Sequence, residues 1–187
     1  MENLETIGAK TIFFPHWSYI IPAEIYENYE CVIFHMTDLP FGRGGSPLQN
    51  LIERGIYETK ISALRCVKEL DAGPIYMKRP LSLYGTAQEI YMRANQIIED
   101  MIVSIILEQP QPQAQQGEAV IFKRRKQSES NIKSLKTLGK VHDYIRMLDA
   151  EGYPKAFIET EHLKFEFSRV SRKLDHLLAD VVIKTLN

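Results

Sequence analysis

The chain has 187 residues, of which 44% are hydrophobic and 25% charged, an ordinary balance for a globular protein of one domain, with or without a small appendage. Its net charge of −1 provides no broad attraction for a polyanion. The longest apolar run, residues 101–107 with Ser104 as an interruption, is far shorter than the roughly 20 residues that cross a bilayer. The acidic first residues also lack the basic start and apolar core of a signal peptide. We therefore expect a cytoplasmic protein without a membrane partner.

The first part of the chain alternates strand and helix patterns. Residues 31–35 form a short apolar run, which is typical of a strand covered on both faces. Ser46 and Pro47 have the form of a helix cap followed by a first-turn proline. Thr86 opens a second capping pattern before a long amphipathic run that Pro110 ends. Further strands are expected at residues 11–14, 60–67 and 74–83, and a short helix at 22–29.

A polar segment divides the chain. Residues 109–117 read QPQPQAQQG, a composition that buries no apolar surface and indicates a linker. After it we expect a helix and three short strands. The predicted domains are a main α/β domain over 1–108 with a mostly parallel sheet, the linker over 109–117, and a small α+β domain over 118–187. The elements expected in the last domain are a helix at 138–149 and strands at 156–160, 163–168 and 177–184.

A histidine and a carboxylate follow two of the predicted strands. His35 closes the apolar run, and Asp71 follows the strand over 60–67 within the motif Leu70-Asp71-Ala72-Gly73. Because open α/β folds bind ligands at the carboxyl edge of a parallel sheet, we expect the two side chains to meet there. An imidazole beside a carboxyl can serve as an acid–base pair.

The motifs around these residues resemble the formyltransferases that use 10-formyltetrahydrofolate, which act on methionyl-tRNA, glycinamide ribonucleotide or amino sugars. The similarity runs from about Thr11 to Leu107. It is carried by His35, Thr37, Leu39, Pro40, Gly44, Pro47 and Gln49, by Glu58-Thr59-Lys60-Ile61-Ser62 and by Leu70-Asp71-Ala72-Gly73. The resemblance implies the formyltransferase fold without its first βαβ unit, and formyl transfer from 10-formyltetrahydrofolate to an amine.

The resemblance also implies that His35 and Asp71 are catalytic. His35 would donate a hydrogen bond to the oxyanion or relay a proton, and Asp71 would accept the proton of the amine. A histidine at a strand end is, taken alone, more often a bystander, so this assignment depends on the resemblance.

One position departs from the family pattern. The catalytic asparagine of the family lies two residues before the histidine, where this chain has Ile33, which cannot donate a hydrogen bond. In one interpretation the protein is an inactive scaffold or binding protein. In the other, a different donor replaces the asparagine: a backbone N–H of residues 42–46, the Thr37 hydroxyl or Asn50.

The expected binding residues fall into two groups. The resemblance implies a pterin pocket formed by two loops, in which Glu69 replaces the usual glycine. Its residues are Trp17, Ser18, Tyr19, Ile20, Ile21, Pro22, Cys66, Lys68, Glu69 and Leu70. The acceptor is expected to contact Thr37, Arg43, Gly44, Gly45 and Asn50. Residues 42–46 are expected to form a tight glycine-rich turn before a helix, and such a turn could also hold a phosphate.

The remaining polar residues bear on partners. Residues 123–126, Lys-Arg-Arg-Lys, form a basic cluster that is more often a solvated strand end than a binding patch. Since the net charge is −1 and the linker is not basic, we favour a small acceptor such as a nucleotide-linked amino sugar over methionyl-tRNA. We also expect a homodimer that covers an exposed sheet edge. Cys31 and Cys66 are expected to be buried thiols, and no His or Cys spacing predicts a metal site.

Overall fold

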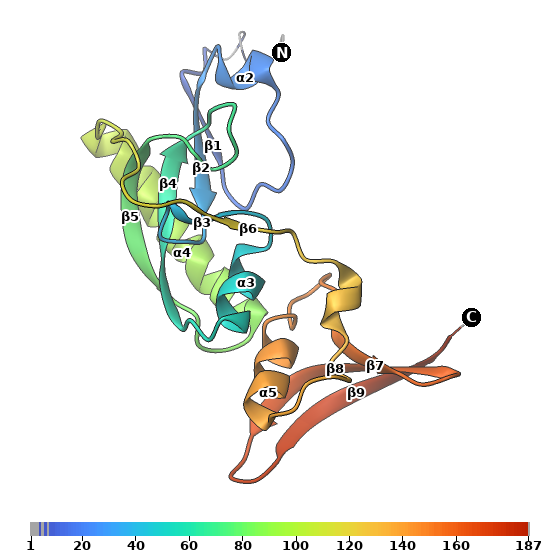
Figure 1. Cartoon of the computed structure of the whole chain (residues 1–187). Coiled ribbons are helices and arrows are strands. Elements are labelled where there is room, and N and C mark those ends of the chain that lie inside the picture. Colours follow the sequence, from blue (N-terminus) through green and yellow to red (C-terminus); the bar gives the residue numbers. More distant parts are fainter. Residues whose placement is uncertain (1–3, 5, 7, 187) are drawn as a thin grey trace. The chain divides into compact units, whose positions relative to one another are not determined.

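The computed structural model describes residues 4, 6 and 8–186 (Figure 1). Its elements group into two units that are not contiguous in sequence. The first unit contains residues up to 47, 58–81 and 93–123, and the second contains 48–57, 82–92 and the residues from 124 onward. No described helix is long and apolar enough to span a membrane. The predicted boundary at 109–117 stays a prediction.

A four-stranded sheet forms the centre of the first unit. Its order is β1 (Thr11–Phe14), β2 (Glu30–His35), β4 (Glu58–Arg65) and β5 (Ile75–Ser82). β1 and β2 are parallel, but β2 and β4 are antiparallel. The sheet is therefore mixed here, where the sequence had predicted a mostly parallel one, because an apolar run reads the same in either strand direction.

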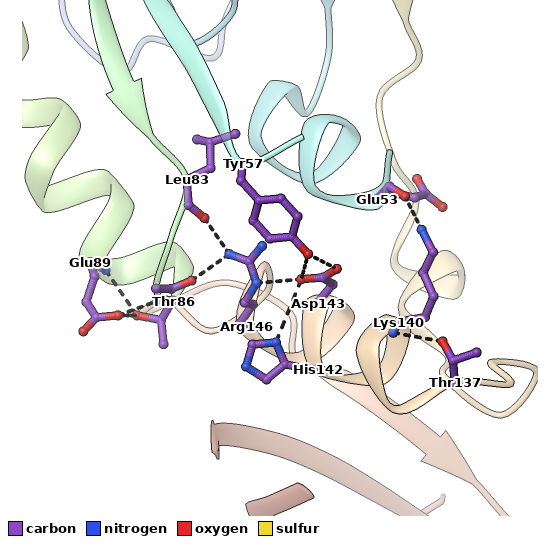
Figure 2. A network of polar contacts seen from close by, with 11 residues as sticks. Glu53, Tyr57, Leu83, Thr86, Glu89, Thr137, Lys140, His142, Asp143 and Arg146 are labelled. Atoms are coloured by element: carbon purple, nitrogen blue, oxygen red, sulfur yellow. Dashed lines mark hydrogen bonds and ion pairs between the residues drawn. The ribbon is translucent and has the colours of Figure 1, made fainter. Parts of the chain in front are cut away.

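The long helix has the limits that its capping signals indicate. α4 (Ala87–Glu108) begins after Thr86, whose Oγ1 accepts a hydrogen bond from the backbone N of Glu89 at 3.3 Å. The Glu89 carboxylate accepts one in return from the backbone N of Thr86 at 2.7 Å, which completes a capping box (Figure 2). Its buried side chains recur every three or four residues: Ile90, Ala94, Ile98, Met101 and Ile105. The short helix between β1 and β2, α2 (Ala23–Tyr26), covers less of the chain than the predicted residues 22–29.

The glycine-rich segment contains a strand that the sequence did not predict. β3 (Phe41–Gly44) pairs in parallel with β6 (Val120–Phe122). Gly42 has a φ of +82°, and a Cβ on it would lie 2.7 Å from the ring of Phe122. Only glycine at this position lets the two strands approach so closely. The tight turn expected over 42–46 is therefore largely a short strand.

The second unit combines helices with an antiparallel sheet. α3 (Pro47–Glu53) begins at the predicted proline, and η1 (Gln127–Ser130) is a single 3₁₀ turn. α5 (Leu138–Arg146) is capped by Thr137. The sheet order is β7 (Ala156–Glu159), β8 (Leu163–Arg172) and β9 (Leu177–Thr185), with both pairings antiparallel.

A buried polar network lies inside the second unit (Figure 2). The Arg146 side chain donates from Nε to Asp143 Oδ1 at 2.8 Å and from Nη1 to the carbonyls of Leu83 and Gly85 at 2.6 and 2.9 Å. The Tyr57 hydroxyl donates to Asp143 Oδ2 at 3.1 Å. Asp143 and Arg146 are only 6% and 3% exposed. Buried charges of this kind are tolerated because each is paired and hydrogen-bonded.

Candidate active site

His35 and Asp71 lie together in the first unit. Both residues are 8% exposed, and Nδ1 of His35 is 3.6 Å from Oδ2 of Asp71. The other ring nitrogen, Nε2, is 2.7 Å from the backbone carbonyl of Gly42. A carbonyl only accepts hydrogen bonds, so Nε2 carries a proton and Nδ1 is the nitrogen that faces the carboxylate. The expectation that these two residues meet is confirmed.

The tautomer determines what this pair can do. With Nε2 protonated, a neutral His35 presents a lone pair at Nδ1 to the lone pairs of the carboxylate. The distance of 3.6 Å is too long for a direct hydrogen bond. The lone pair on Nδ1 and those of the carboxylate repel each other. One added proton, on Nδ1 or on the carboxylate, would make the interaction between the two side chains attractive. Nδ1 of His35 and the Asp71 carboxylate are therefore the groups that an acid–base role would use.

Asp71 reaches this position by a different route from the one expected. Because β2 and β4 are antiparallel, the carboxyl end of β4 lies beside the start of β2, with Arg65 opposite Val32. The turn over residues 66–73 must therefore carry the chain back toward His35. Asp71 has a φ of +52° in this turn, a conformation that aspartate tolerates better than most residues. Its Oδ2 accepts a hydrogen bond from the backbone N of Gly44 at 2.8 Å.

Four of the predicted acceptor-binding residues are hydrogen-bonded to Asp71 or to residues near the pair: Thr37, Arg43, Gly44 and Gly45. The Thr37 hydroxyl donates to the Gly42 carbonyl at 3.3 Å, and Gly45 N donates to the Phe122 carbonyl at 3.1 Å. Arg43 donates from Nε and Nη2 to Oε1 of Gln115 at 3.0 and 2.7 Å. The fifth residue, Asn50, is buried in α3 of the second unit, where its Oδ1 accepts from Arg54 at 3.0 Å.

Three of the donors suggested in place of the missing asparagine are already engaged. Gly44 N bonds Asp71, Gly45 N bonds Phe122, and the Thr37 hydroxyl bonds Gly42. Ile33 lies in β2 between Phe14 of β1 and Leu64 of β4. As Ile33 is two residues from His35 on a strand, its side chain is on the same face of the sheet. The face therefore carries a sec-butyl group at the position where the sequence resemblance implies an amide.

The two predicted pterin loops are exposed. The side chains of Trp17, Tyr19 and Ile20 are 52%, 77% and 80% exposed, whereas Ile21 is buried. In the other loop, residues 68–70 are exposed, and Leu70 is 60% exposed. Within residues 8–186, no hydrogen bond, ion pair or ring contact joins residues 17–22 to 66–70. Their role in binding stays a prediction.

The cysteines differ in burial. Burial raises the pKa of Cys31 to about 11, so this thiol stays protonated at neutral pH. The pKa of Cys66 is also raised, first by burial and then by Asp71. Cys66 follows β4 and is only half-buried, so the prediction of two buried thiols holds for Cys31 alone.

Sequence reasoning missed several residues that support the site. Gln115, in the segment predicted as a free linker, donates to the carbonyls of Asp71 and Gly73 at 2.8 and 2.9 Å. The backbone of Gln113 pairs with Ile75, with N–O distances of 2.7 and 2.8 Å. The segment is thus hydrogen-bonded to the first unit, although none of its residues is buried. Nothing in the run QPQPQAQQG distinguishes Gln115 from the other glutamines.

A second charged cluster involves Asp38. Lys78 donates to Asp38 Oδ1 and to the Leu39 carbonyl, both at 2.5 Å, and Lys60 lies 2.9 Å from Oδ2. Burial alone would raise the pKa of Asp38, but the two lysines outweigh it and lower that pKa. Beside Lys78 there is an open cavity of about 280 Å³, lined by Leu39, Ile75, Lys78 and residues 113–116.

The basic cluster is divided by the structure. Arg125 has a side chain only 8% exposed and pairs with Glu53 within the second unit. Lys123, Arg124 and Lys126 are exposed beyond the end of β6, as predicted for a solvated strand end. Arg125 and Glu53 also line an open cavity of about 670 Å³ together with Tyr144 and Lys133.

Comparison with known proteins identifies the family. Residues 127–184 match the family described as the methionyl-tRNA formyltransferase C-terminal domain. The solved methionyl-tRNA formyltransferase of Clostridium thermocellum is 57% identical and superposes with a TM-score of 0.96, over 98% of this chain and 82% of that one. The chain belongs to the formyltransferase family. The α/β formyltransferase fold expected from the motifs is thereby confirmed.

Other formyltransferases are more distant. The methionyl-tRNA formyltransferase of Rhizobium meliloti is 28% identical over 170 residues, which are 86% of this chain and 54% of that protein. The chain spans about a third to a half of the curated relatives it matches, with 35% and 54% covered in two of them. A structure described as a likely sugar N-formyltransferase of Mycobacterium tuberculosis is 17% identical with a TM-score of 0.67, over 86% of this chain and 73% of that one. At that identity the likeness concerns the fold alone.

Proposed function

We propose that this formyltransferase-family chain transfers a formyl group from 10-formyltetrahydrofolate to an amine, with His35 and Asp71 as its acid–base pair. The observation that carries the proposal is the buried pair itself. Nδ1 and Oδ2 are 3.6 Å apart, and the Gly42 carbonyl holds the ring in one tautomer. A site arranged around one proton suits a reaction in which an amine must lose one.

The proposed reaction has two steps. The neutral amine attacks the formyl carbon, whose carbonyl oxygen becomes a tetrahedral oxyanion. Collapse of this intermediate breaks the bond to N10 of the folate and leaves a formamide and tetrahydrofolate. The proton lost by the amine is passed to N10 as the bond breaks. Nδ1 of His35 and the Asp71 carboxylate hold that proton between the two steps.

We further propose that the Trp17–Pro22 loop and residues 66–70 hold the pterin ring. Trp17 and Tyr19 form an exposed aromatic pair with ring centroids 5.7 Å apart and an interplanar angle of 66°, so each offers an apolar ring face for stacking. Titration with tetrahydrofolate, followed by the fluorescence of Trp17, tests this assignment. Trp17 is the single tryptophan of the chain, so the signal has one source. Absence of a saturable change, in a protein that is active, would place the ring elsewhere.

The proposed acceptor is the amine of methionyl-tRNA, which reverses the preference drawn from composition. The relatives from Clostridium thermocellum and Rhizobium meliloti, at 57% and 28% identity, are named for that substrate, whereas the sugar enzyme is similar only in fold. A small amino sugar is the second candidate, because a net charge of −1 and a glutamine-rich segment at 109–117 favour a small acceptor over a polyanion.

The deciding assay measures transfer of labelled formyl from 10-formyltetrahydrofolate to methionyl-tRNA and to a nucleotide-linked amino sugar. Binding of the tRNA should weaken with salt, by about 0.7–0.9 in the log–log slope for each phosphate contacted. Transfer to the sugar alone would restore the second candidate. Equal background rates for wild type and His35→Asn with every acceptor would instead support a binding protein without this activity.

A further inference from the structure

We propose that Gln115 is a positioning residue that holds Asp71 in the orientation needed to pair with His35. The proposal deepens the proposed function and rests on it. Its evidence, however, lies in a set of hydrogen bonds within the first unit. Gln115 joins Asp71 across a sequence separation of 44 residues and Arg43 across one of 72.

The orientation of the Gln115 amide follows from its partners. Nε2 donates to the carbonyls of Asp71 and Gly73 at 2.8 and 2.9 Å, and Oε1 accepts from Nε and Nη2 of Arg43 at 3.0 and 2.7 Å. A guanidinium can only donate and a carbonyl can only accept. The amide therefore has one orientation in which both sets of bonds form.

These bonds close a ring that returns to β3. The backbone N of Gly44 donates to Oδ2 of Asp71, and the carbonyl of Asp71 accepts from Gln115. Gln115 in turn accepts from Arg43, the residue that precedes Gly44. Both the carboxylate and the backbone of Asp71 are thus tied to the same short strand. The carbonyl of Gly42 in that strand also holds His35, so β3 orients the two members of the pair relative to each other.

Asp71 requires such support because of its backbone. A φ of +52° is one that residues other than glycine rarely adopt, and it persists only where the surroundings impose it. Gln115 binds the carbonyl of Asp71 itself and that of Gly73 two residues later, so it constrains the turn on both sides of Ala72. The backbone pairing of Gln113 with Ile75 anchors the segment that carries it.

Two variants separate the possible roles of Gln115. Gln115→Glu keeps an acceptor for Arg43 but places a carboxylate oxygen against two carbonyls. Gln115→Met keeps the volume and loses all four bonds. Gln116→Glu and Gln116→Ala are the matched controls, since Gln116 is exposed and adjacent and the first of them adds the same charge. If only the Arg43 anchor matters, Gln115→Glu behaves like the wild type.

We expect both Gln115 variants to lower kcat for formyl transfer by about 10- to 100-fold, because misplacing a catalytic group by about 1 Å costs on that order. The proposal gives Gln115 a role through Asp71 and not through contact with a substrate, so KM for each substrate should stay within about twofold. In an Asp71→Asn background the Gln115 variants should have little further effect, since the effects of coupled residues are not additive. Gln115 variants with wild-type kcat, or with effects that add fully to Asp71→Asn, would overturn the proposal.

A second readout does not depend on activity. The ring ¹⁵N chemical shifts of His35, identified by their loss in His35→Asn, report the carboxylate beside Nδ1. Gln115→Glu and Gln115→Met should change these shifts at fixed pH, and the Gln116 variants should not. If no acceptor is formylated, the proposed function fails, but the ring shifts still decide whether Gln115 positions Asp71. Unchanged ring shifts in both Gln115 variants would refute the role.

Discussion

The backbone carbonyl of Gly42 accepts a hydrogen bond from Nε2 of His35 at 2.7 Å. This contact selects the ring tautomer and turns Nδ1 toward Asp71, so a glycine on β3 determines which nitrogen is available for chemistry. The ring of Phe122 and the methyl group of Thr37 lie within 2.8 Å of the position where a Gly42 Cβ would be. Because Gly42 has no side chain, β6 can pack closely against β3 at this position. The Gly42 carbonyl at the same position is the group that bonds His35.

Removal of either member of the pair should nearly abolish formyl transfer. His35→Gln and Asp71→Asn each take away a group that holds the transferred proton, and such groups contribute about 10²–10⁴ in rate. Single-turnover assays with labelled 10-formyltetrahydrofolate measure the effect. Thermal unfolding of each variant shows whether the fold is retained. Rates within about twofold of wild type would rule out this pair as the proton carrier.

Restoration of an amide beside the site should accelerate the reaction. Ile33 lies on the face of β2 that carries His35, and three of the donors suggested in place of the family asparagine, namely Gly44 N, Gly45 N and the Thr37 hydroxyl, are already bonded. We expect Ile33→Asn to raise kcat by up to about 10²–10³, the usual worth of an oxyanion donor. Ile33→Leu, which adds no donor, is the control. If both variants lose activity equally, the oxyanion is stabilised from another direction.

Gly44 should tolerate no side chain. Its φ is +105°, and a Cβ would lie 2.4 Å from the carbonyl oxygen of Phe122, so Gly44→Ala must separate β3 from β6. Gly55, at a φ of +74° with open space around it, provides the matched control for backbone strain alone. We expect Gly55→Ala to cost about 1–2 kcal/mol and Gly44→Ala at least about 2–3 kcal/mol in urea unfolding. Equal costs would mean that the strands separate without penalty.

The buried network of the second unit should be sensitive to loss of one partner. Asp143→Ala leaves the Arg146 guanidinium buried without its carboxylate, which typically costs about 3–5 kcal/mol. Lys184→Ala removes an exposed partner of Glu166 and should change stability by less than about 1 kcal/mol. Denaturant unfolding of both variants compares the two pairs. A small effect at Asp143 would indicate that water enters the network.

Glu53 should make the second unit less stable in acid. Burial alone would raise the pKa of Glu53, but the hydrogen bond from Tyr144 at 2.5 Å and the Arg125 guanidinium lower it below 4.5. The unfolded chain therefore takes up this proton first as the pH falls. The stabilisation by Glu53 is complete above about pH 4.5 and is lost as the pH falls through the folded-state pKa.

The check is urea unfolding of wild type and Glu53→Gln between about pH 3 and pH 7. The stability difference between them should be largest near neutral pH and shrink in acid. Glu151→Gln, at an exposed position, should follow the wild-type curve. A Glu53 effect that does not vary with pH would show that the carboxylate charge is not what stabilises the unit.

The sequence by itself determined the elements whose signals are local. Thr86, Glu89 and Pro110 delimit α4 through a cap, a capping box and a stop, each acting within one helical turn. The apolar run before His35 marked β2, and the motif spacing predicted that His35 and Asp71 would meet. These features could be predicted because they depend on neighbours a few residues away, or on a pattern that the family shares.

The tertiary structure alone decided the support of the site. The antiparallel direction of β4, the pairing of β3 with β6 and the binding of Gln115 to Asp71 and Arg43 join residues that are far apart in the chain. No local preference selects one glutamine in QPQPQAQQG, because its bonds exist only once Arg43 and the turn at Asp71 are already in place.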